Sequence, residues 1–434
     1  MKVALVHDYL NEFGGAERVL EAFCEIWPDA PIYTAFVNKE SSAYERFKGK
    51  KIITSWVQNV PFFASFLHSP LRFLAPLIWG SFVRQLADYD VVLASSSWYV
   101  TKGFKRKSTK GTKSTEGMRG FVEICYCHTP PRYLYGYPTS VEWQKYWPMR
   151  VYAAIVNHYM RVYDFEAAQK VDFFIANSKE VAARIKKFYR RDSKVIYPPV
   201  DVKKFTVNSS QLTVKRKSVN REPTTNYFLV VSRLVAAKKV DIVVEVCAKL
   251  GLPLKVVGGG KEIENLKKIA SKYSSSPSNS FRINSAKRSR EVEDVESSPQ
   301  GRTIKSSIEF LGEVEDSELV ELYQNCRAVI FSAEQEDFGL VPVEAMACGK
   351  PVIVNAQGGV LESVIDALPA GRGKGTGVYF DPPTTGSLTL ALNNFFDLEK
   401  KGYFDPTFIR NHARKFSKER FKKEIKKFVE SRIK

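Results

Sequence analysis

Residues 328–355 have the sequence AVIFSAEQEDFGLVPVEAMACGKPVIVN. The apolar run at 328–332 predicts a strand, the stretch 343–348 predicts a helix, and 351–355 predicts a second strand. An apolar strand followed by a helix and another apolar strand is typical of a parallel sheet whose two faces are both covered. This unit therefore predicts an α/β fold.

The same alternation of strand and helix recurs along the chain in two sets. Further strand-like runs lie at 2–6, 91–95, 120–125, 173–177, 194–197, 227–232, 254–257 and 378–380. Two prolines at 198–199 end the first set, and a polar, basic stretch at 203–226 separates it from the second, as a linker would. We therefore expect an N-terminal domain over 1–198 and a C-terminal domain over 199–412.

Two other segments differ in composition from these domains. Residues 271–307 are rich in serine and poor in apolar side chains, which predicts a disordered surface insertion. Residues 413–434 place apolar side chains at helical spacing among lysines, which predicts a basic helix with one apolar face. We treat 413–434 as a separate C-terminal helix.

The composition places the chain among ordinary globular proteins, with 44% apolar and 26% charged residues. The net charge of +19 is concentrated in two stretches. Residues 102–119 hold seven Lys/Arg against one Glu, and 413–434 hold ten against three. Locally concentrated positive charge indicates an anionic partner, such as nucleic acid, acidic lipid or a phosphorylated ligand.

The cysteines indicate neither disulfides nor a metal site. The six cysteines form no CxxC pair, which favours reduced, buried thiols in a cytosolic protein. Cys125, Cys127 and His128 stand close together, but a structural zinc site needs a fourth ligand, and no second pair is present. Asp88 and Asp90 resemble a metal-binding DxD, yet Asp90 directly precedes a strand, where capping explains it better. We expect no metal.

The most apolar stretch is 60–83, and three prolines together with His68 and Arg72 interrupt it. A membrane-spanning helix tolerates such interruptions poorly. The stretch fits a buried core segment, or a loop and helix that face lipid or an acceptor. The start of the chain has too short an apolar run for a signal peptide and predicts a first buried strand.

Three groups of residues follow predicted strands and could bind an anion or a sugar. Gly14 and Gly15 lie between the first strand and a helix, where a glycine backbone can approach a ligand closely, although a tight turn explains them equally well. They do not form GxGxxG, which disfavours a dinucleotide site. Arg233 and Lys238 follow another strand and could hold a diphosphate, or could be solvated loop cations.

The third group lies within the opening stretch. Residues 338–340 mark the start of a helix, where backbone amides can meet hydroxyls or phosphate. Glu344 then falls in the first turns of that helix, and its carboxylate can accept hydrogen bonds from two neighbouring hydroxyls. Glu336 precedes it by eight residues.

These residues form an ordered set that resembles glycosyltransferase family 4. Besides the E-x7-E spacing of Glu336 and Glu344, the matching segments are GGAERV (14–19), CYCHTP (125–130), ANSKEVAARI (176–185), VIYPPVD (195–201), SRLVAAKKVD (232–241) and EAMACGKPVI (344–353). The resemblance runs along nearly the whole chain, apart from 102–119, 203–226 and 271–307. It implies the GT-B fold, two doubly wound Rossmann-like domains that face a central cleft.

The resemblance also implies roles for five side chains. Arg233 and Lys238 match the pair that holds the donor diphosphate and stabilises it as the leaving group. Glu344 matches the ribose-binding glutamate, and Glu336 matches the glutamate near the transferred sugar. His128 matches a histidine that contacts the donor sugar, although an isolated histidine on a strand is more often part of the core.

Two loops complete the implied site. Gly14 and Gly15 match the N-terminal loop that closes over the phosphates. Phe338, Gly339 and Leu340 match a loop whose amides contact sugar hydroxyls. The last helix is expected to cross back onto the N-terminal domain, as it does in the family.

The resemblance implies a retaining transferase that moves a hexose from a nucleotide-sugar to a glycan or to a polyprenyl-linked saccharide, with no cofactor and no metal. The pattern favours mannose from GDP-mannose. The C-terminal domain would bind the donor, and the N-terminal domain would bind the acceptor. A cytoplasmic enzyme is expected, held by its basic stretches and 60–83 against the inner face of an anionic membrane.

Two alternatives stay open at this point. One is a nucleotide-sugar epimerase of the same fold, which needs no acceptor. The other is a protein that binds RNA or another polyanion, which the charge allows. The chain lacks the aromatic and basic platform of an RNA-binding motif, so we expect no nucleic-acid partner.

Overall fold

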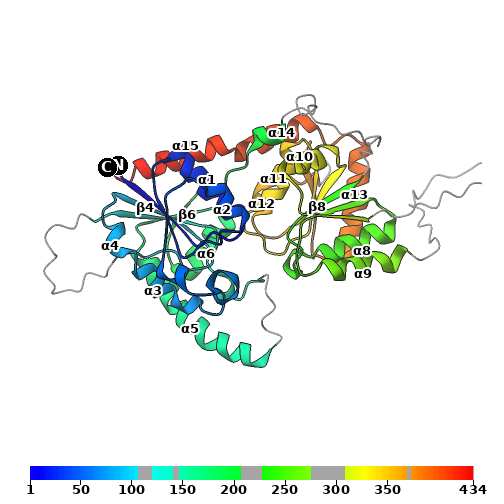
Figure 1. The fold of residues 1–434 in the computed structure, drawn as a ribbon. Helices are drawn as coiled ribbons and strands as arrows, with labels where there is room; N and C mark the ends of the chain where they lie inside the picture. The colour runs from blue at the N-terminus through cyan, green and yellow to red at the C-terminus, as the bar shows by residue number, and fades with distance from the viewer. Residues whose placement is uncertain (106–119, 140–145, 207–226, 275–307, 369–372, 434) are drawn as a thin grey trace, which may run out of the picture.

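The computed structural model describes residues 1–105, 120–139, 146–206, 227–274, 308–368 and 373–433. Within them the chain forms two parallel β-sheets, each covered by helices on both faces, that lie side by side (Figure 1). The predicted α/β architecture of two doubly wound domains is therefore confirmed.

The N-terminal sheet has seven parallel strands in the order β3-β2-β1-β4-β5-β6-β7. Its strands are β1 Val3–His7, β2 Ile32–Thr34, β3 Ile52–Thr54, β4 Val91–Ser96, β5 Val122–Cys127, β6 Phe173–Ala176 and β7 Ser193–Val195. The central strands β1 and β4 are buried along their whole length, because helices cover both faces of the sheet.

The C-terminal sheet has six parallel strands in the order β10-β9-β8-β11-β12-β13. Its strands are β8 Phe228–Val231, β9 Leu254–Val257, β10 Ile308–Gly312, β11 Ala328–Phe331, β12 Val352–Asn355 and β13 Gly377–Phe380. In both sheets the strand order reverses beside the first strand, so each sheet has a switch point at its carboxyl edge, where open α/β sheets bind ligands.

Helices fill the connections between strands. In the N-terminal half they are α1 Gly15–Ile26, α2 Ser42–Phe47, α3 Ala75–Gly80, α4 Val83–Leu86, α5 Trp147–Lys170, α6 Lys179–Tyr189 and α7 Val202–Thr206. In the C-terminal half they are α8 Val240–Leu250, α9 Ile263–Ser274, α10 Asp316–Asn325, α11 Leu340–Ala347, α12 Val360–Ser363, α13 Thr385–Lys400, α14 Pro406–Ala413 and α15 Lys418–Glu430. Short helical turns include η2 Phe63–Leu67, η4 Arg132–Leu134 and η6 Ala236–Lys238.

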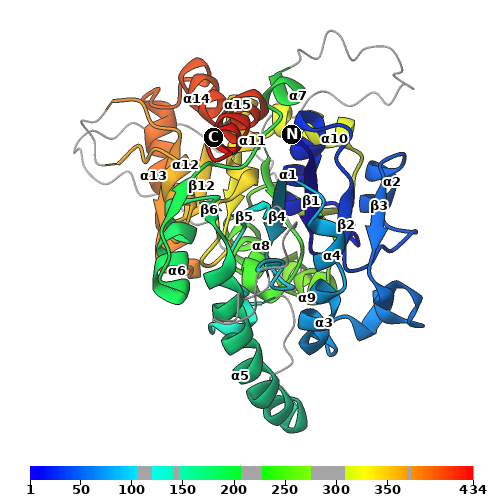
Figure 2. The same ribbon diagram turned by 90° about the vertical axis from the view of Figure 1, so that its left-hand side faces the viewer.

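The last helix, α15, does not pack on the C-terminal sheet but runs back beside α1 (Figures 1 and 2). Its apolar face, formed by Phe421, Ile425 and Val429, is fully buried. The ring of Phe421 stacks on Phe23 of α1 with 5.9 Å between centroids. Lys418 adds ion pairs to two glutamates of α1. The chain therefore crosses between the domains twice.

The structure places parts of three segments that the sequence singled out. The stretch 60–83 is largely core, which agrees with the first of its two interpretations, since Phe63, Ile78 and Trp79 are buried. The first residue of the basic stretch 102–119, Lys102, is 1% exposed and forms an ion pair with Asp164, because burial of a charge requires a partner of opposite sign. Residues 106–119 lie outside the described residues. Helix α9 extends to residue 274, so the insertion predicted from 271 begins later; 275–307 lie outside the described residues.

Candidate functional site

The predicted site residues follow the carboxyl ends of strands in both sheets. His128 comes directly after β5, and the glycine pair at 14–15 follows β1. In the C-terminal sheet, Arg233 follows β8 and Glu336 follows β11. Because all strands of a parallel sheet end at the same edge, each sheet presents its residues at one edge.

Lys238 and Glu336 form the central pair of the C-terminal half. The Nζ atom of Lys238 lies 2.6 Å from Oε2 of Glu336, and each side chain is about one-fifth exposed. Burial opposes the charge of Glu336, but Lys238 and Arg132 outweigh it, so the pKa of Glu336 is lowered and the group stays a carboxylate. The structure therefore presents a fixed cation next to a fixed anion at the end of β11.

Arg233 lies further out than Lys238. Its side chain is 59% exposed and reaches Glu12 of the N-terminal domain, with 3.8 Å between Nη1 and Oε2. The turn that carries it lies against glycine backbone, since a Cβ on Gly258 would lie 2.0 Å from the Ser232 carbonyl oxygen. That glycine requirement was not recognised in the sequence, although the triplet at 258–260 was a signal for it.

Glu344 is 2% exposed and lies between the domains. One of its oxygens pairs with Nη1 of Arg18 from α1, and the other accepts a hydrogen bond of 2.8 Å from the hydroxyl of Tyr323. The carboxylate of Glu344 in turn raises the pKa of Arg18. A carboxylate oxygen has two lone pairs, so each oxygen of Glu344 can still accept one more hydrogen bond.

The two predicted glycine-containing loops meet each other across the domains. A Cβ on Gly15 would lie 3.1 Å from a methyl carbon of Leu340, so the start of α1 lies against the start of α11. Gly339 has φ +83° and immediately precedes α11, a conformation that favours glycine. The Gly14 N–H donates to Oε2 of Glu17 at 2.9 Å.

The Phe338 side chain belongs to the core and not to the cleft. It is 2% exposed and packs against Tyr197 and Phe416, with 5.5 Å between centroids in each case. Of the predicted loop 338–340, the side chain of Phe338 therefore anchors the loop, and its backbone is the part that a ligand could meet.

His128 ends a chain of buried hydrogen bonds. Its Nε2 lies 2.8 Å from Oγ of Ser95, and that oxygen lies 3.0 Å from Nδ1 of His7. Nε2 of His7 then lies 3.2 Å from Oε1 of Glu17. Strand pairing creates this chain, because His7 of β1 is the register partner of Ser95 of β4.

The carboxylate at one end limits the direction of these hydrogen bonds. A carboxylate oxygen accepts, so Nε2 of His7 donates to Glu17. The Ser95 hydroxyl has one hydrogen and can donate to only one of the two imidazoles. Burial, helped by the charge of His7, lowers the pKa of His128 to about 4, so His128 is neutral at pH 7. One ring nitrogen of His128 is therefore a donor and the other an acceptor, and Nε2 is the one that meets Ser95.

Asp337 joins the domains directly beside Glu336. Its Oδ1 lies 2.9 Å from Nη2 of Arg132 and 2.5 Å from Nη1 of Arg184, both from the N-terminal domain. Arg184 is 2% exposed, and it also donates to the Thr129 hydroxyl at 3.2 Å. This cluster gave no signal in the sequence, because Asp337 lies about 150 residues from Arg184 and about 200 residues from Arg132 along the chain.

A second contact between the domains uses a helix end. The carboxylate of Glu362, on α12, accepts hydrogen bonds from the backbone N–H groups of Lys179 at 2.8 Å and Glu180 at 3.0 Å. These are the first residues of α6 in the N-terminal domain, where unsatisfied N–H groups and the helix dipole favour an anion.

The described residues offer little for a metal ion. Among them, no group of three or more His, Cys, Asp or Glu side chains is arranged to hold one. The carboxylate of Asp90 accepts a hydrogen bond of 2.7 Å from the Lys2 backbone N–H, at the start of β1. All six cysteines are buried thiols.

Comparisons with known proteins agree with this architecture. Residues 290–428 match the family described as "Glycosyl transferases group 1". The chain is 23% identical over 396 residues to the alpha-1,3/1,6-mannosyltransferase ALG2 of Candida glabrata. The aligned region covers 84% of this chain and 78% of that protein.

Solved structures match over the whole length. The Anabaena protein Alr3699/HepE, in complex with UDP, superposes with a TM-score of 0.66 at 18% identity, over 99% of this chain and 100% of that one. Sucrose-phosphate synthase from Thermosynechococcus elongatus superposes with a TM-score of 0.69 at 14% identity, over 99% of each chain. The chain therefore has the GT-B fold, and in sequence it resembles the group 1 glycosyl transferases.

Proposed function

We propose that this protein is a retaining glycosyltransferase of family 4, which moves a hexose from a nucleoside diphosphate sugar to a saccharide acceptor. The observation that carries the proposal is the Lys238–Glu336 pair at the end of β11, in a chain that resembles group 1 glycosyl transferases. Glu344 lies on the helix that follows this loop, as the predicted ribose-binding residue would require.

The charges support the departure of a diphosphate. Negative charge builds on the diphosphate as the bond to the sugar breaks, and fixed cations stabilise it best where water is scarce. Lys238 is held in place by Glu336, and Arg233 stands at the rim with a more exposed side chain. We assign Lys238 to the phosphate nearest the sugar, and we assign Arg233 to the more exposed side of the diphosphate.

The glycine loop and His128 serve the sugar end in this proposal. Neutral His128 cannot compete with the two cations for the diphosphate charge, and its Nδ1, the ring nitrogen that does not meet Ser95, can exchange a hydrogen bond with a sugar hydroxyl. Retention, with attack from the face that the diphosphate leaves, follows from the family resemblance. The N-terminal domain would hold the acceptor, a glycan or a lipid-linked saccharide.

Two relatives point to different donors. The ALG2 protein is described as a mannosyltransferase, and the HepE structures contain UDP or UDP-glucose. We place mannose, with a guanine nucleotide, first because both the sequence pattern and the ALG2 similarity favour it. The first experiment should therefore identify the base before the sugar.

That experiment is a thermal-shift panel of GDP, UDP and ADP and their hexose derivatives. It compares the wild type with Glu344→Gln, which keeps an acceptor for Tyr323 but loses the charge. A ligand at about 100 times Kd stabilises the folded state by about 2.7 kcal/mol, which is readily measured. We expect one base to stabilise the wild type and to lose most of that effect in the variant.

Glu399→Gln provides the matched control, because Glu399 pairs with Arg327 on the C-terminal domain, outside the predicted site. With the donor identified, Lys238→Met should lower kcat by about 10²–10³, the usual cost of removing one preorganised donor. If no nucleotide stabilises the wild type, the proposal is wrong. Isomerisation of the nucleotide-sugar without an acceptor would support an epimerase instead.

A further inference from the structure

The large exposed hydrophobic side chains of this protein gather on one helix. The described residues include sixteen such side chains, and eight of them belong to Tyr146 and to seven residues of α5. They are Tyr146, Trp147, Met149, Val151, Ile155, Tyr159, Val162 and Phe165. Isolated exposed hydrophobic residues are ordinary, but a contiguous group indicates an interaction site.

Helix α5 is apolar on both of its faces. The inner face, with Ala153, Met160 and Ala167, is buried in the core of the N-terminal domain. The outer face repeats at helical spacing through Val151, Ile155 and other exposed residues. In Figure 2 the N-terminal part of α5 extends beyond the rest of the domain, so nothing in the described chain covers this outer face.

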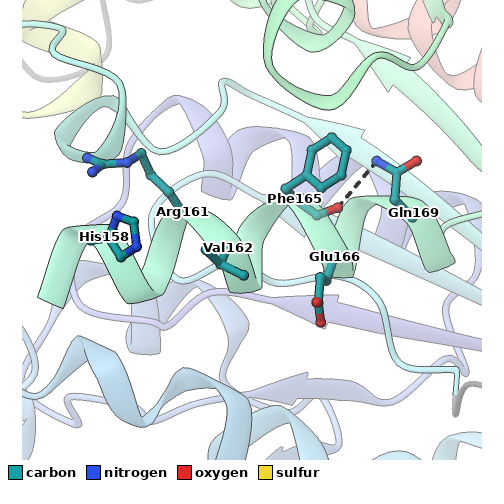
Figure 3. Close-up of a pocket in the computed structure, with 6 residues that line it drawn as sticks. All are labelled: His158, Arg161, Val162, Phe165, Glu166 and Gln169. Carbon is teal, nitrogen blue, oxygen red and sulfur yellow. Dashed lines mark hydrogen bonds between the residues drawn. The ribbon is translucent and has the colours of Figure 1, made fainter.

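Figure 3 shows the C-terminal part of the same face. A hollow of about 510 Å³ runs along α5 here, and the six residues that line it all belong to this helix. Val162 and Phe165 supply its apolar surface, and His158 and Arg161 supply polar groups beside them. The hollow is part of the exposed face, and none of the predicted site residues lines it.

The charge on this face is mainly positive. Two arginines, at 150 and 161, and one acidic residue, Glu166, are exposed along Tyr146 and α5. Aromatic side chains with a polar end, here Tyr146, Trp147 and Tyr159, are enriched where protein meets the boundary of a bilayer. A helix with an apolar face flanked by arginines binds such a boundary by apolar burial and by attraction to anionic lipids.

We propose that the outer face of α5 docks the N-terminal domain onto the surface of an anionic membrane. A second copy of the chain fits this face less well, because the described residues of α5 expose two arginines and one glutamate, so pairing α5 with α5 would bring an excess of like charge together. The net charge of +19 also repels another copy and attracts anionic lipid.

The structure moves the membrane contact away from the segments that the sequence suggested. The apolar face of α15 is buried against α1, so that helix presents only its charged side. The stretch 60–83 is mostly core but exposes Phe62, Phe66 and Leu77. Tyr152 of α5 donates a hydrogen bond to the Pro70 carbonyl, which places this stretch beside α5.

A docked N-terminal domain narrows the class of acceptor. This step rests on the proposed function: an acceptor domain held at a membrane surface suits a saccharide whose lipid anchor stays in the bilayer. The docking surface itself needs no nucleotide and can be tested separately.

The test uses the full chain and vesicles of phosphatidylcholine, alone or with 30% phosphatidylglycerol, in a flotation assay at low and at physiological salt. The variant is Val151→Glu/Ile155→Glu. The matched control is Leu390→Glu, since Leu390 is 62% exposed on α13 of the other domain and Ile155 is 69% exposed. We expect binding to the anionic vesicles, at least about tenfold weaker in the α5 variant and unchanged in the control.

Three results would overturn the proposal. The first is wild-type protein that does not bind anionic vesicles. The second is an α5 variant that binds as well as the wild type. The third is a dimer in sedimentation that the α5 substitutions dissociate, because it would assign this face to a second copy. Stabilisation by nucleotide, measured on the same variants, reports on the proposed function and is expected to stay unchanged.

Discussion

The carboxylates of the candidate site each hold a cation. Glu336 holds Lys238, and Glu344 holds Arg18. For Glu336, the charges of Lys238 and Arg132 outweigh burial, so its pKa is lowered and it stays a carboxylate. A diphosphate donor would compete with Glu336 for Lys238, so donor binding should loosen this pair while a sugar hydroxyl takes its place on the carboxylate.

At this scale His128 gives a prediction about pH. The pKa of His128 is lowered to about 4 by burial and by His7, while an unfolded histidine has a pKa near 6.5. Between these values the unfolded chain binds a proton that the folded chain does not. The free energy of unfolding therefore falls as pH is lowered through this window, by about 2 kcal/mol at pH 5 relative to pH 7.

His128→Gln should remove that part of the pH dependence, because an amide does not titrate. Urea unfolding at pH 7 and pH 5 measures it, and the difference between the two pH values should shrink relative to wild type. His158→Gln is the control, since His158 lies exposed on α5. Equal pH dependence in the His128 variant and the wild type would contradict the assignment of a neutral, buried imidazole.

The positions of the candidate site residues after strand ends could be predicted from local motifs, but contacts with distant partners could not. Arg233, Lys238, Glu336 and Glu344 follow strand ends, which the apolar runs reveal. Asp337 gave no signal, because an aspartate in a loop has many ordinary uses, and its arginines come from the other domain. The fold determines which charged side chains come into contact, and the local spacing of residues does not reveal these contacts.

Among the structural elements, the turn into α11 offers a second prediction. Gly339 has φ +83°, and a Cβ there would lie 2.7 Å from a methyl group of Val360. Gly136 has a similar φ of +76°, with nothing within 4 Å of a Cβ. In both alanine variants the free energy of unfolding should fall by about 1–2 kcal/mol, because alanine disfavours the left-handed backbone. In Gly339→Ala it should fall by about 1–3 kcal/mol more, roughly the cost of overpacking.

Denaturant unfolding of the two variants measures the difference. The comparison isolates the steric part, because the backbone cost is shared. If Gly339→Ala is no less stable than Gly136→Ala, then the loop before α11 can move away from α12 without cost, and the close packing at the start of α11 is not required.

Helix α15 supplies the third prediction. Phe421 is fully buried between Phe23 and Tyr126, so Phe421→Ala should destabilise the protein by about 3–5 kcal/mol. Phe428 on the same helix is only partly buried, and its alanine variant should cost clearly less. Thermal or urea unfolding checks both, and a Phe421 variant that is destabilised by less than about 1 kcal/mol would mean that α15 contributes little to the N-terminal core.

Most strands could be predicted from their apolar runs, including the three-residue β7, but β2, β3 and β10 could not. The runs that became β1, β4 and β11 are continuous and buried. Strands β2 and β3 have three residues each, too few to show a period, and neither was predicted. The outer face of α5 gave no signal either, because apolar residues at helical spacing look the same whether they meet a core or a solvent-facing surface.

For the whole molecule, several contacts between the domains are polar. Asp337 with its two arginines, Glu362 of α12 with the start of α6, and Arg18 with Glu344 all bridge the halves. Polar contacts of this kind resemble those of transient interfaces, which lets domains move relative to one another. The bridge at Asp337 therefore holds the two domains together through polar groups, and the other polar bridges contribute to the same arrangement.

The fourth prediction follows from that bridge. Asp337→Ala removes one of the two charged partners of buried Arg184 and leaves Glu180 as the other, which should cost about 1–3 kcal/mol of stability. It should also increase the radius of gyration measured by small-angle X-ray scattering, because the domains lose a closing contact. Asp192→Ala is the control, since Asp192 is 90% exposed on the N-terminal domain. An unchanged radius would show that the remaining bridges suffice to hold the domains closed.

The return of α15 to the N-terminal domain has a consequence for how the chain is made. Phe23 and Phe421 touch in the finished core but leave the ribosome almost four hundred residues apart. At about 5–20 residues per second, the first half waits roughly 20–80 s for its last helix. During that interval the groove on α1 stays open on a nascent chain, so it is a natural place for a holdase to bind and, in its absence, for newly made chains to associate with one another.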